Sequence, residues 1–388
     1  MGLSSRKPSD ARHCHGAGRA HDPQQARRQT CLGTAGRSLI AAAALLLSAL
    51  SCAAETLRIA TWNVELDRAG PGLLAEALLK GRDPQAEAVL RVLAALDADV
   101  ILLTSVDYDR NLAALSLMAD RLATLGAPYP HRFALRPNTG WQTGIDLDGD
   151  GRAGGPGDAQ GWGQFSGQGG MAILSRLPIE AESVRDFSAF LWADLPGALL
   201  PDGMGEETRR LQRLSSTGHW EVPLRLASGG RLRLLAFHAT PPVFDGPEDR
   251  NGRRNHDEAA FWLHLLNGDL PFPPPAAPFV LLGDSNLDPA DGDGRPQAIR
   301  ALLAHPALQD PQPKGRSGHA DPGHSGDPVL DTAVFPQTGG LRVDLVLPSA
   351  GVTVTAAGVL WPPEDDPLMP DLLAASRHFP VWVEIAVP

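Results

Sequence analysis

The sequence predicts an α+β fold in which packed β-sheets are flanked by helices within one domain. Many short apolar or alternating runs predict strands, whereas helical spacing of apolar residues occurs in only some of the connections between them. No internal repeat is visible. A hydrophobic content of 43% is enough for a packed core in a chain of 388 residues, and 35 Pro with 41 Gly indicate many loops.

The first half of the chain is predicted to interleave strands with helices. Residues 57–63 alternate in polarity as a half-buried strand does, and Val89, Val92 and Leu93 recur at helical spacing. The expected elements are, in order, strand 57–63, helix 84–97, strand 99–104, helix 111–125 and strand 171–175. A Gly-rich loop is expected over residues 137–170.

The second half is predicted to be richer in strands. Ser228, Gly229 and Gly230 separate two apolar runs and indicate a β-hairpin. The expected elements are strands 220–226 and 231–238, helix 255–267, a strand through 278–282, and strands 343–347, 352–360 and 378–387. Residues 186–218 are expected to be irregular, and residues 311–340 to form a long loop.

Residues 1–54 have the pattern of an export segment, which leaves residues 55–388 as the folded domain. Arg27, Arg28 and Arg37 precede an apolar stretch at 39–50, and small residues follow at 52–54. Twelve apolar-rich residues are too few to span a bilayer, but they suit the hydrophobic region of a signal peptide. A periplasmic or secreted protein is therefore expected. A twin-arginine signal, an assigned start that is too early, a lipoprotein anchor at Cys52 and an uncleaved anchor stay open as alternatives.

Cysteine use and charge exclude several classes of function. Cys14, Cys31 and Cys52 all fall in the export segment, so the mature domain has neither disulfides nor thiolate chemistry. That segment carries seven Lys/Arg and two Asp, so its removal lowers the formal net charge from −11 to −16. Such a charge disfavours tight non-specific binding to nucleic acid, which depends on neutralising phosphates. A monomer without a membrane span in the mature chain is expected.

The segment Gly283-Asp284-Ser285-Asn286 follows a short apolar run and is the strongest single motif. Strand tips are where open α/β sheets bind ligands, and side chains at i and i+2 project the same way. Asp284 and Asn286 could therefore converge on one polar target, although a simple turn would use the same residue types.

Other predicted strand ends carry polar groups of the same kind. Asn63 follows Thr-Trp, His238 closes an apolar run, Asp344 lies in Val-Asp-Leu-Val-Leu-Pro, and His378 precedes Phe-Pro-Val. Each alone is weak. With Asp284 and Asn286 they form a set of two His, two Asp and two Asn that suits phosphoester hydrolysis, which requires a polarised water and cationic donors.

From about residue 57 to 386 the chain resembles the endonuclease/exonuclease/phosphatase superfamily. The resemblance rests on the ordered motifs Thr-Trp-Asn, Phe-His-Ala, Gly-Asp-Ser-Asn, Val-Asp-Leu-Val-Leu-Pro-Ser and His-Phe-Pro-Val. It implies a four-layer α/β sandwich, with two packed, mostly antiparallel sheets and the site at their top. It also implies hydrolysis of a phosphodiester or phosphomonoester with Mg²⁺ or Mn²⁺.

The same resemblance implies a role for each matching residue. Asn63 would position the metal or phosphate, and His238 would donate to the phosphate or leaving group. Asp284 would orient or deprotonate the attacking water, with Asn286 binding a phosphate oxygen. Asp344 would hold His378 in its cationic form, and His378 would stabilise the developing negative charge.

Two departures from the family pattern affect the metal. Ser105 stands where the family places a metal-binding Glu, and Arg377 stands where it usually has an Asp. Either Asp107 substitutes, joining Asn63 and Asp284 as metal ligands, or the Arg377 guanidinium replaces the cation and binds the phosphate. The alternative to an enzyme is a secreted phosphate-ligand binding module that has lost the metal carboxylates.

Two further segments carry candidate ligands. Asp146, Asp148 and Asp150 with Gly151 match positions 1, 3, 5 and 6 of a calcium loop, and Asp158 lies one residue beyond the position of its usual Glu. A structural Ca²⁺, or a merely solvated acidic turn, is expected there.

The charged run 245–258 follows His238 closely in sequence. Arg254 and Asn255 in this run are candidates for substrate binding, although most such runs are only charged loops that lead into a helix.

Overall fold

Two large β-sheets form the centre of the fold in the computed structural model, which describes residues 55–387. The predicted export segment, residues 1–54, lies outside the described residues. None of the helices within residues 55–387 has the length and apolarity needed to cross a bilayer.

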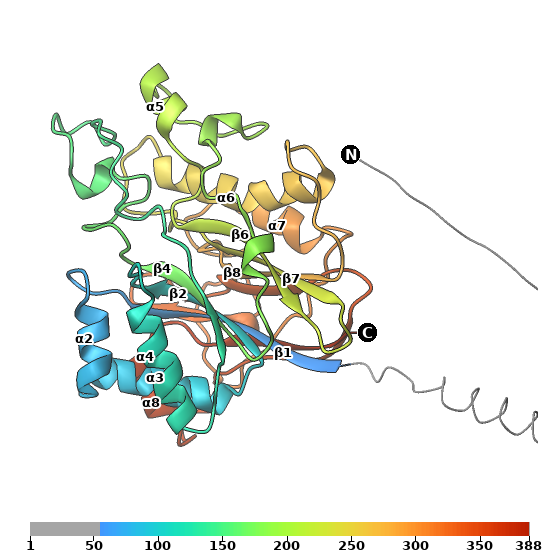
Figure 1. The fold of residues 1–388 in the computed structure, drawn as a ribbon. Coiled ribbons are helices and arrows are strands. Elements are labelled where there is room, and N and C mark those ends of the chain that lie inside the picture. Colours follow the sequence, from blue (N-terminus) through green and yellow to red (C-terminus); the bar gives the residue numbers. More distant parts are fainter. Residues whose placement is uncertain (1–54, 388) are drawn as a thin grey trace, which may run out of the picture. The chain divides into compact units, whose positions relative to one another are not determined.

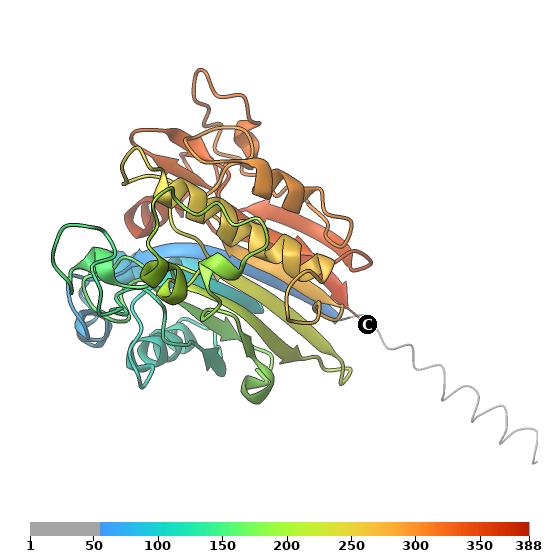
Figure 2. The same ribbon diagram turned by 90° about the horizontal axis from the view of Figure 1, so that it is seen from above.

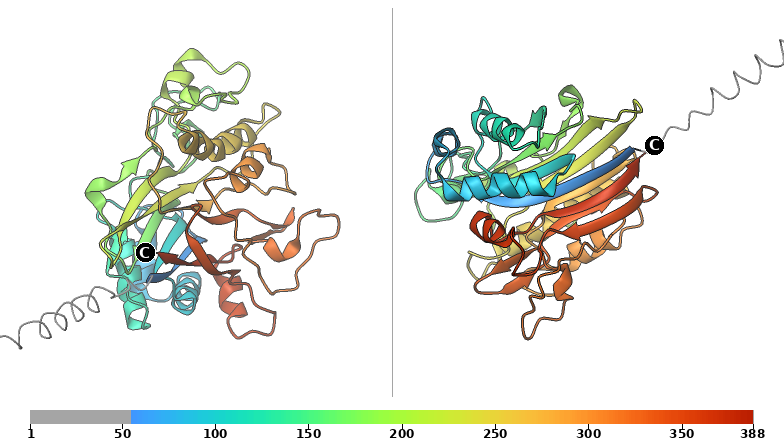
Figure 3. Two further views of the ribbon diagram at one scale, coloured as in Figure 1. Left: turned by 90° about the vertical axis from the view of Figure 1, so that its right-hand side faces the viewer. Right: turned by 90° about the horizontal axis from the view of Figure 1, so that it is seen from below.

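The first sheet has six strands in the order β12-β13-β1-β2-β4-β3. Its strands are β1 (Glu55–Leu66), β2 (Val100–Val106), β3 (His131–Phe133), β4 (Gly170–Ser175), β12 (Thr353–Val359) and β13 (Val381–Val387). Only β1 and β2 pair in parallel. The first and last strands of the described chain therefore lie side by side, as Figure 3 shows.

The second sheet has five strands in the order β11-β8-β7-β6-β5. Its strands are β5 (Arg185–Asp186), β6 (Gly218–Arg225), β7 (Arg231–His238), β8 (Phe279–Asp284) and β11 (Asp344–Pro348). The predicted hairpin is present between β6 and β7, where Gly229 has a φ of 86°. The parallel pair β7–β8 brings two strand ends to the same edge of the sheet.

Helices cover the outer face of each sheet (Figures 1 and 2). On one side lie α2 (Leu73–Lys80), α3 (Pro84–Leu96), α4 (Ala113–Thr124) and α8 (Met369–Ala375), and on the other lie α6 (Arg250–Asn267) and α7 (Gln297–Leu303). The remaining helical elements are α5 (Glu206–Leu211) and four 3₁₀ turns: Pro156–Asp158, Ala181–Ser183, Trp192–Asp194 and Pro328–Leu330. A short hairpin, β9 (Ala333–Phe335) with β10 (Gly339–Leu341), completes the fold.

The central strands of the second sheet are buried on both faces, which explains their nearly unbroken apolar sequences. In β7, Leu234 packs in the cluster between the sheets, whereas its neighbours Leu235 and Phe237 pack beneath α6 and α7. In β8, Leu282 likewise packs in the cluster between the sheets, and Leu281 packs beneath α6 and α7. Alternate side chains of a strand point to opposite faces, so one run of residues fills two cores.

The predicted α+β sandwich of two mostly antiparallel sheets flanked by helices is confirmed. The expected irregular segment 186–218 contains α5 and the 3₁₀ turn Trp192–Asp194, and the expected loop 311–340 contains β9 and most of β10. Helices α2, α7 and α8 were not predicted. They are only seven or eight residues long, and none has an N-cap side chain that accepts a hydrogen bond from the first turn.

Candidate active site

Ends of strands from both sheets converge on the carboxylate of Asp284. Antiparallel pairing places Asp344 of β11 directly opposite Asp284, and parallel pairing places His238 of β7 beside it. The other sheet contributes Asn63 from β1, whose Nδ2 donates a hydrogen bond to Asp284 Oδ2 at 2.8 Å. The site therefore depends on how the two sheets pack against each other.

Asp284 has the environment of a carboxyl group that titrates near neutrality. Its side chain is fully buried, and its Oδ1 accepts a hydrogen bond from the backbone N–H of Asn286 at 2.8 Å. Burial, and then the nearby Asp344 carboxylate, raise the pKa of Asp284 to about 7, although His378 and Asn63 act in the opposite direction. Such a group can accept a proton from water at physiological pH.

Asp344 and His378 form a buried ion pair. Nδ1 of His378 lies 2.8 Å from Asp344 Oδ2, which also accepts a hydrogen bond from the Thr332 hydroxyl at 3.0 Å. Burial alone would lower the pKa of His378, but the charge and hydrogen bond of Asp344, together with the charges of Asp284 and Glu65, raise the pKa to about 9. His378 is therefore an imidazolium at neutral pH, with Nε2–H as the donor it can offer to a substrate.

His238 is the neutral histidine of the site. Its Nε2 lies 3.5 Å from Asp284 Oδ2, and its Nδ1 is buried without a hydrogen-bond partner in the described residues. Burial, together with the positive charge of His378, lowers the pKa of His238 to about 3. The two histidines therefore differ in charge over the whole physiological range.

Asn286 is held in the left-handed region with a φ of 48°, and its Nδ2 donates to the carbonyl of Ala239 at 2.9 Å. Behind it, Nδ2 of Asn255 donates to the carbonyls of Thr240 and Ser285 at 2.7 and 2.8 Å. Asn255 thus fixes the loops that present Asn286, while its own Oδ1 is buried and has no partner among the described residues.

Arg254 has a similar supporting position. Its guanidinium is buried and donates to the backbone carbonyls of Leu214, Gln160, Arg213 and Ser215. These bonds tie helix α6 to two loops that border the site. Of the two residues predicted to bind substrate, Arg254 lines the cavity beside His238, and Asn255 lies behind the loops that present Asn286.

Sequence reasoning missed Glu65, a carboxylate beside the site. Strand β1 is irregular between Asn63 and Leu66, where its pairing with β2 shifts, and both Glu65 and Ser105 have positive φ there. Arg377 donates to Glu65 through its backbone N–H at 2.9 Å and through Nε at 2.7 Å. Glu65 also affects the charge of His378, because its carboxylate helps to raise the pKa of that imidazole.

Asp107 lies apart from this group. Its two oxygens accept hydrogen bonds from the backbone N–H groups of Gly169 and Arg68, at 3.0 and 2.9 Å. Burial is the main reason that its pKa is raised to about 6. The structure thus places Asp107 where it orders a loop, outside the cluster of groups that could share a metal ion with Asp284.

The donor set around Asp284 fits a hard divalent cation. Ligand atoms of Asp284, Asp344 and His378 lie within 4.8 Å of one another. Asp344 Oδ1 is buried and has no hydrogen-bond partner in the described chain, and repulsion between the two carboxylates contributes to the raised pKa of Asp284. A magnesium-type ion is usually held by one or two carboxylates and several waters, and Asp284 and Asp344 could hold it.

The acidic loop brings three of its four predicted ligands together. Ligand oxygens of Asp146, Asp148 and Asp158 lie within 4.8 Å of one another, and Asp150 lies outside that group. Asp158 is buried and accepts backbone hydrogen bonds from Leu147, Gly154 and Gly155. Burial opposes its ionisation, but these hydrogen bonds prevail and lower the pKa of Asp158.

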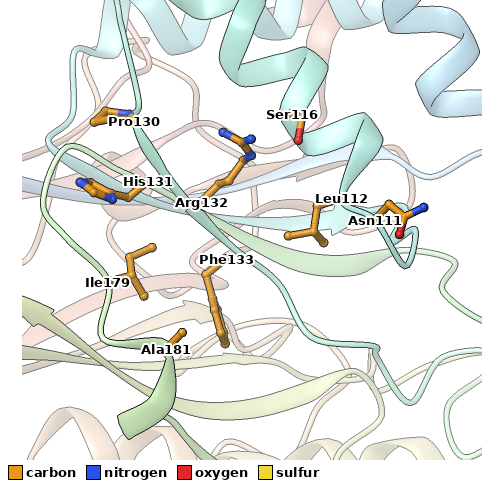
Figure 4. A pocket seen from close by; sticks show the side chains of 9 residues that line it. All are labelled: Asn111, Leu112, Ser116, Pro130, His131, Arg132, Phe133, Ile179 and Ala181. Carbon is orange, nitrogen blue, oxygen red and sulfur yellow. The ribbon is translucent and has the colours of Figure 1, made fainter.

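Two cavities of the described domain differ in their relation to this site. One, of about 780 Å³, is lined by His238 and by residues of the loops around it. The other, of about 450 Å³, lies between α4 and β3 and is lined by residues such as Asn111 and Arg132 (Figure 4). The second cavity shares no residue with the cluster around Asp284.

Comparison with known proteins agrees with the geometry. The sequence model of the Endonuclease/Exonuclease/phosphatase family matches residues 60–378. No curated protein matches the chain.

Solved structures resemble the fold at low identity. An endonuclease/exonuclease/phosphatase from Beutenbergia cavernae is 19% identical, covering 86% of this chain and 72% of that one, with a TM-score of 0.48. Sphingomyelinase C from Streptomyces griseocarneus is 17% identical, covering 85% and 99%, with a TM-score of 0.44. The human nocturnin catalytic domain with bound sulfate is 14% identical, covering 86% and 95%, with a TM-score of 0.46.

Proposed function

Because the chain belongs to the Endonuclease/Exonuclease/phosphatase family, we propose that it is a phosphoric ester hydrolase that cleaves a phosphodiester or phosphomonoester bond. The observation that carries the proposal is the convergence of Asn63, Asp344 and His238 on a buried Asp284 with a pKa of about 7. A carboxyl group of this kind, beside an imidazolium that is charged at neutral pH, suits attack of water on phosphorus.

Each group has a distinct part in that reaction. Asp284 accepts a proton from the attacking water, whose oxygen forms the new bond to phosphorus. Asn63 holds the Asp284 carboxylate in place through its hydrogen bond to Oδ2. His378 donates Nε2–H to a non-bridging phosphate oxygen, and Asp344 keeps its ring charged and oriented. Asn286 binds a second phosphate oxygen, and the ester bond to the leaving alcohol breaks.

His238 completes the site on the side of the leaving group. As a neutral imidazole at the edge of the 780 Å³ cavity, it can take up at Nε2 the proton that Asp284 received from water and release that proton to the departing alkoxide. Its Nε2 lies within reach of Asp284, so the proton taken from water has a short path to the leaving group. The proton balance then closes without another acid or base.

We also propose that the enzyme uses Mg²⁺ or Mn²⁺. Such an ion, held by Asp284 and Asp344, would supply positive charge that polarises the phosphate. The protein is further proposed to be exported by its first 54 residues and to act as a monomer, in the periplasm or outside the cell.

A substrate panel tests this function. DNA, RNA, a phospholipid and a sugar phosphate are incubated with the protein, with Mg²⁺, Mn²⁺ or a chelator, and released alcohol or phosphate is measured. Hydrolysis that requires His378 and Asp284 supports the proposal. Ser105 at the usual position of the metal-binding Glu favours one rival, a phosphate-ligand binding module. Tight binding of a phosphate ester with no turnover under any metal would favour that rival.

A further inference from the structure

The cavity beside His238 is enclosed by two segments that lie far apart in the sequence. The Gly-rich segment after β3 contributes Asp148 and Trp162, and the segment after β7 contributes Phe244 and residues up to the start of α6. Arg250 joins the two walls, because its Nη1 donates to the carbonyl of Leu147 at 3.1 Å. With a volume of about 780 Å³, the cavity has the size of a small-molecule site.

Two exposed aromatic rings mark this cavity. Among the exposed large hydrophobic side chains of residues 55–387, only Trp162 and Phe244 are aromatic, and both line it. Trp162 is 63% exposed and Phe244 is 89% exposed. Phe244 also has a φ of 69°, which is uncommon for a bulky side chain. Both rings can therefore stack on a ligand.

The charges of the cavity limit what the ligand can be. Asp148, Asp245 and Glu248 line it together with Arg250 and Arg254, whose Nε and Nη2 donate to backbone carbonyls. Two guanidinium groups thus face three carboxylates, which leaves an excess of one negative charge. Such a wall repels a second phosphate or a polyanionic chain, but its carboxylates can accept hydrogen bonds from hydroxyl groups.

We propose that this cavity binds the alcohol portion of the substrate, and that this portion is a single uncharged ring that bears hydroxyl groups. The ring stacks against Trp162 and Phe244, and its hydroxyls donate to Asp245 or Glu248. Sugars and nucleosides share this chemistry. The inference rests on the proposed hydrolysis, because it takes His238 as the side of the site from which the alcohol leaves.

The test compares substrates that share a phosphate group but differ in the alcohol. The value of kcat/KM is measured for a hexose phosphate, a nucleoside monophosphate, glycerol phosphate and a short oligonucleotide, in wild type, W162A and F244A. L79A is the matched control, because Leu79 is 74% exposed on α2 and does not line the cavity. Binding of the hexose phosphate and nucleoside monophosphate is measured in parallel by calorimetry.

The proposal predicts that W162A and F244A each lower kcat/KM at least tenfold, equivalent to about 1.4 kcal/mol, for one of the two ring-bearing phosphates. The kcat/KM for glycerol phosphate should change less than about twofold in these variants, and L79A should leave kcat/KM unchanged for every substrate. The ring-bearing phosphate whose kcat/KM falls identifies the alcohol portion as a sugar or as a nucleoside. Equal losses for all substrates, or an oligonucleotide preferred to both ring-bearing phosphates, would overturn the proposal.

Calorimetry separates failure of this inference from failure of the proposed function. The wild type could hydrolyse no ester and yet bind a ring-bearing phosphate in a manner that W162A abolishes. In that case the proposed ligand of the cavity is correct and the proposed hydrolytic function is wrong. If no ester is hydrolysed and no ring-bearing phosphate binds, or W162A leaves binding intact, the cavity proposal is overturned.

Discussion

Replacing Asp344 with Asn tests how the site keeps His378 charged. Asp344 Oδ2 lies 2.8 Å from His378 Nδ1, and its charge and hydrogen bond are the main reasons that the pKa of His378 is raised to about 9. A hydrogen bond to a charged group contributes about 1.5–3 kcal/mol. At about 1.4 kcal/mol per unit, D344N should lower the pKa of His378 by about 1–2 units.

The assay is an NMR titration of the His378 ring in metal-free protein, wild type against D344N. In the same variant, the alkaline limb of the rate profile should move to lower pH, because less of the imidazolium survives. The reasoning is refuted if the pKa of His378 in D344N stays within a few tenths of the wild-type value. It is also refuted if the wild-type ring titrates below its ordinary value of 6.5.

The same pair makes stability depend on pH in a defined direction. The folded-state pKa of His378, about 9, lies above its ordinary value of 6.5. The stability that it contributes is therefore fully present below about pH 6.5 and is lost as the pH rises through about 9. Thermal unfolding of wild type should show this loss, and D344N should show a smaller one.

Other perturbations have equally direct outcomes. Burial raises the pKa of Glu258 from 4.5 to about 7, so wild-type stability should fall from about pH 4.5 to 7, and E258Q should flatten that slope in urea unfolding measured at several pH values. R377A should destabilise the protein by less than about 1 kcal/mol, because its pair with Glu65 is partly exposed. Complete loss of turnover in R377A, with no effect of a chelator on wild type, would instead support the guanidinium as the replacement for the cation. Added Ca²⁺ should raise the melting temperature of wild type but not of D158N if the acidic loop binds the ion, and an unchanged wild type would remove that prediction.

Most of the site could be predicted from strand ends, because a buried strand that stops on a polar residue leaves a clear signal. Asp284 follows four buried apolar residues, and Asp344 lies at the start of another such run. Which partner each group takes could not be predicted, since it depends on sheet register and on how two sheets pack. The bond from Asn63 to Asp284 joins residues that are 221 positions apart.

The missed carboxylate has a local cause. A regular continuation of β1 would make Glu65 an ordinary strand residue, whereas the observed irregularity gives it a φ of 48°. The sequence around Glu65 does not predict that change, because no glycine or other residue typical of positive φ stands at this position. Asp107 illustrates the reverse case. It was a reasonable ligand by spacing, yet both of its oxygens accept hydrogen bonds from loop amides.

The central claim is that a buried Asp284 with a pKa of about 7 acts as the general base in phosphoester hydrolysis. The most direct measurement is the initial rate of hydrolysis of the best ester from the panel by wild type and D284N, at pH 8 with Mg²⁺ or Mn²⁺. Loss of a positioned general base costs about 10²- to 10⁴-fold, so the account predicts a fall of that size with the fold intact by circular dichroism. A D284N variant that retains the wild-type rate would contradict the account.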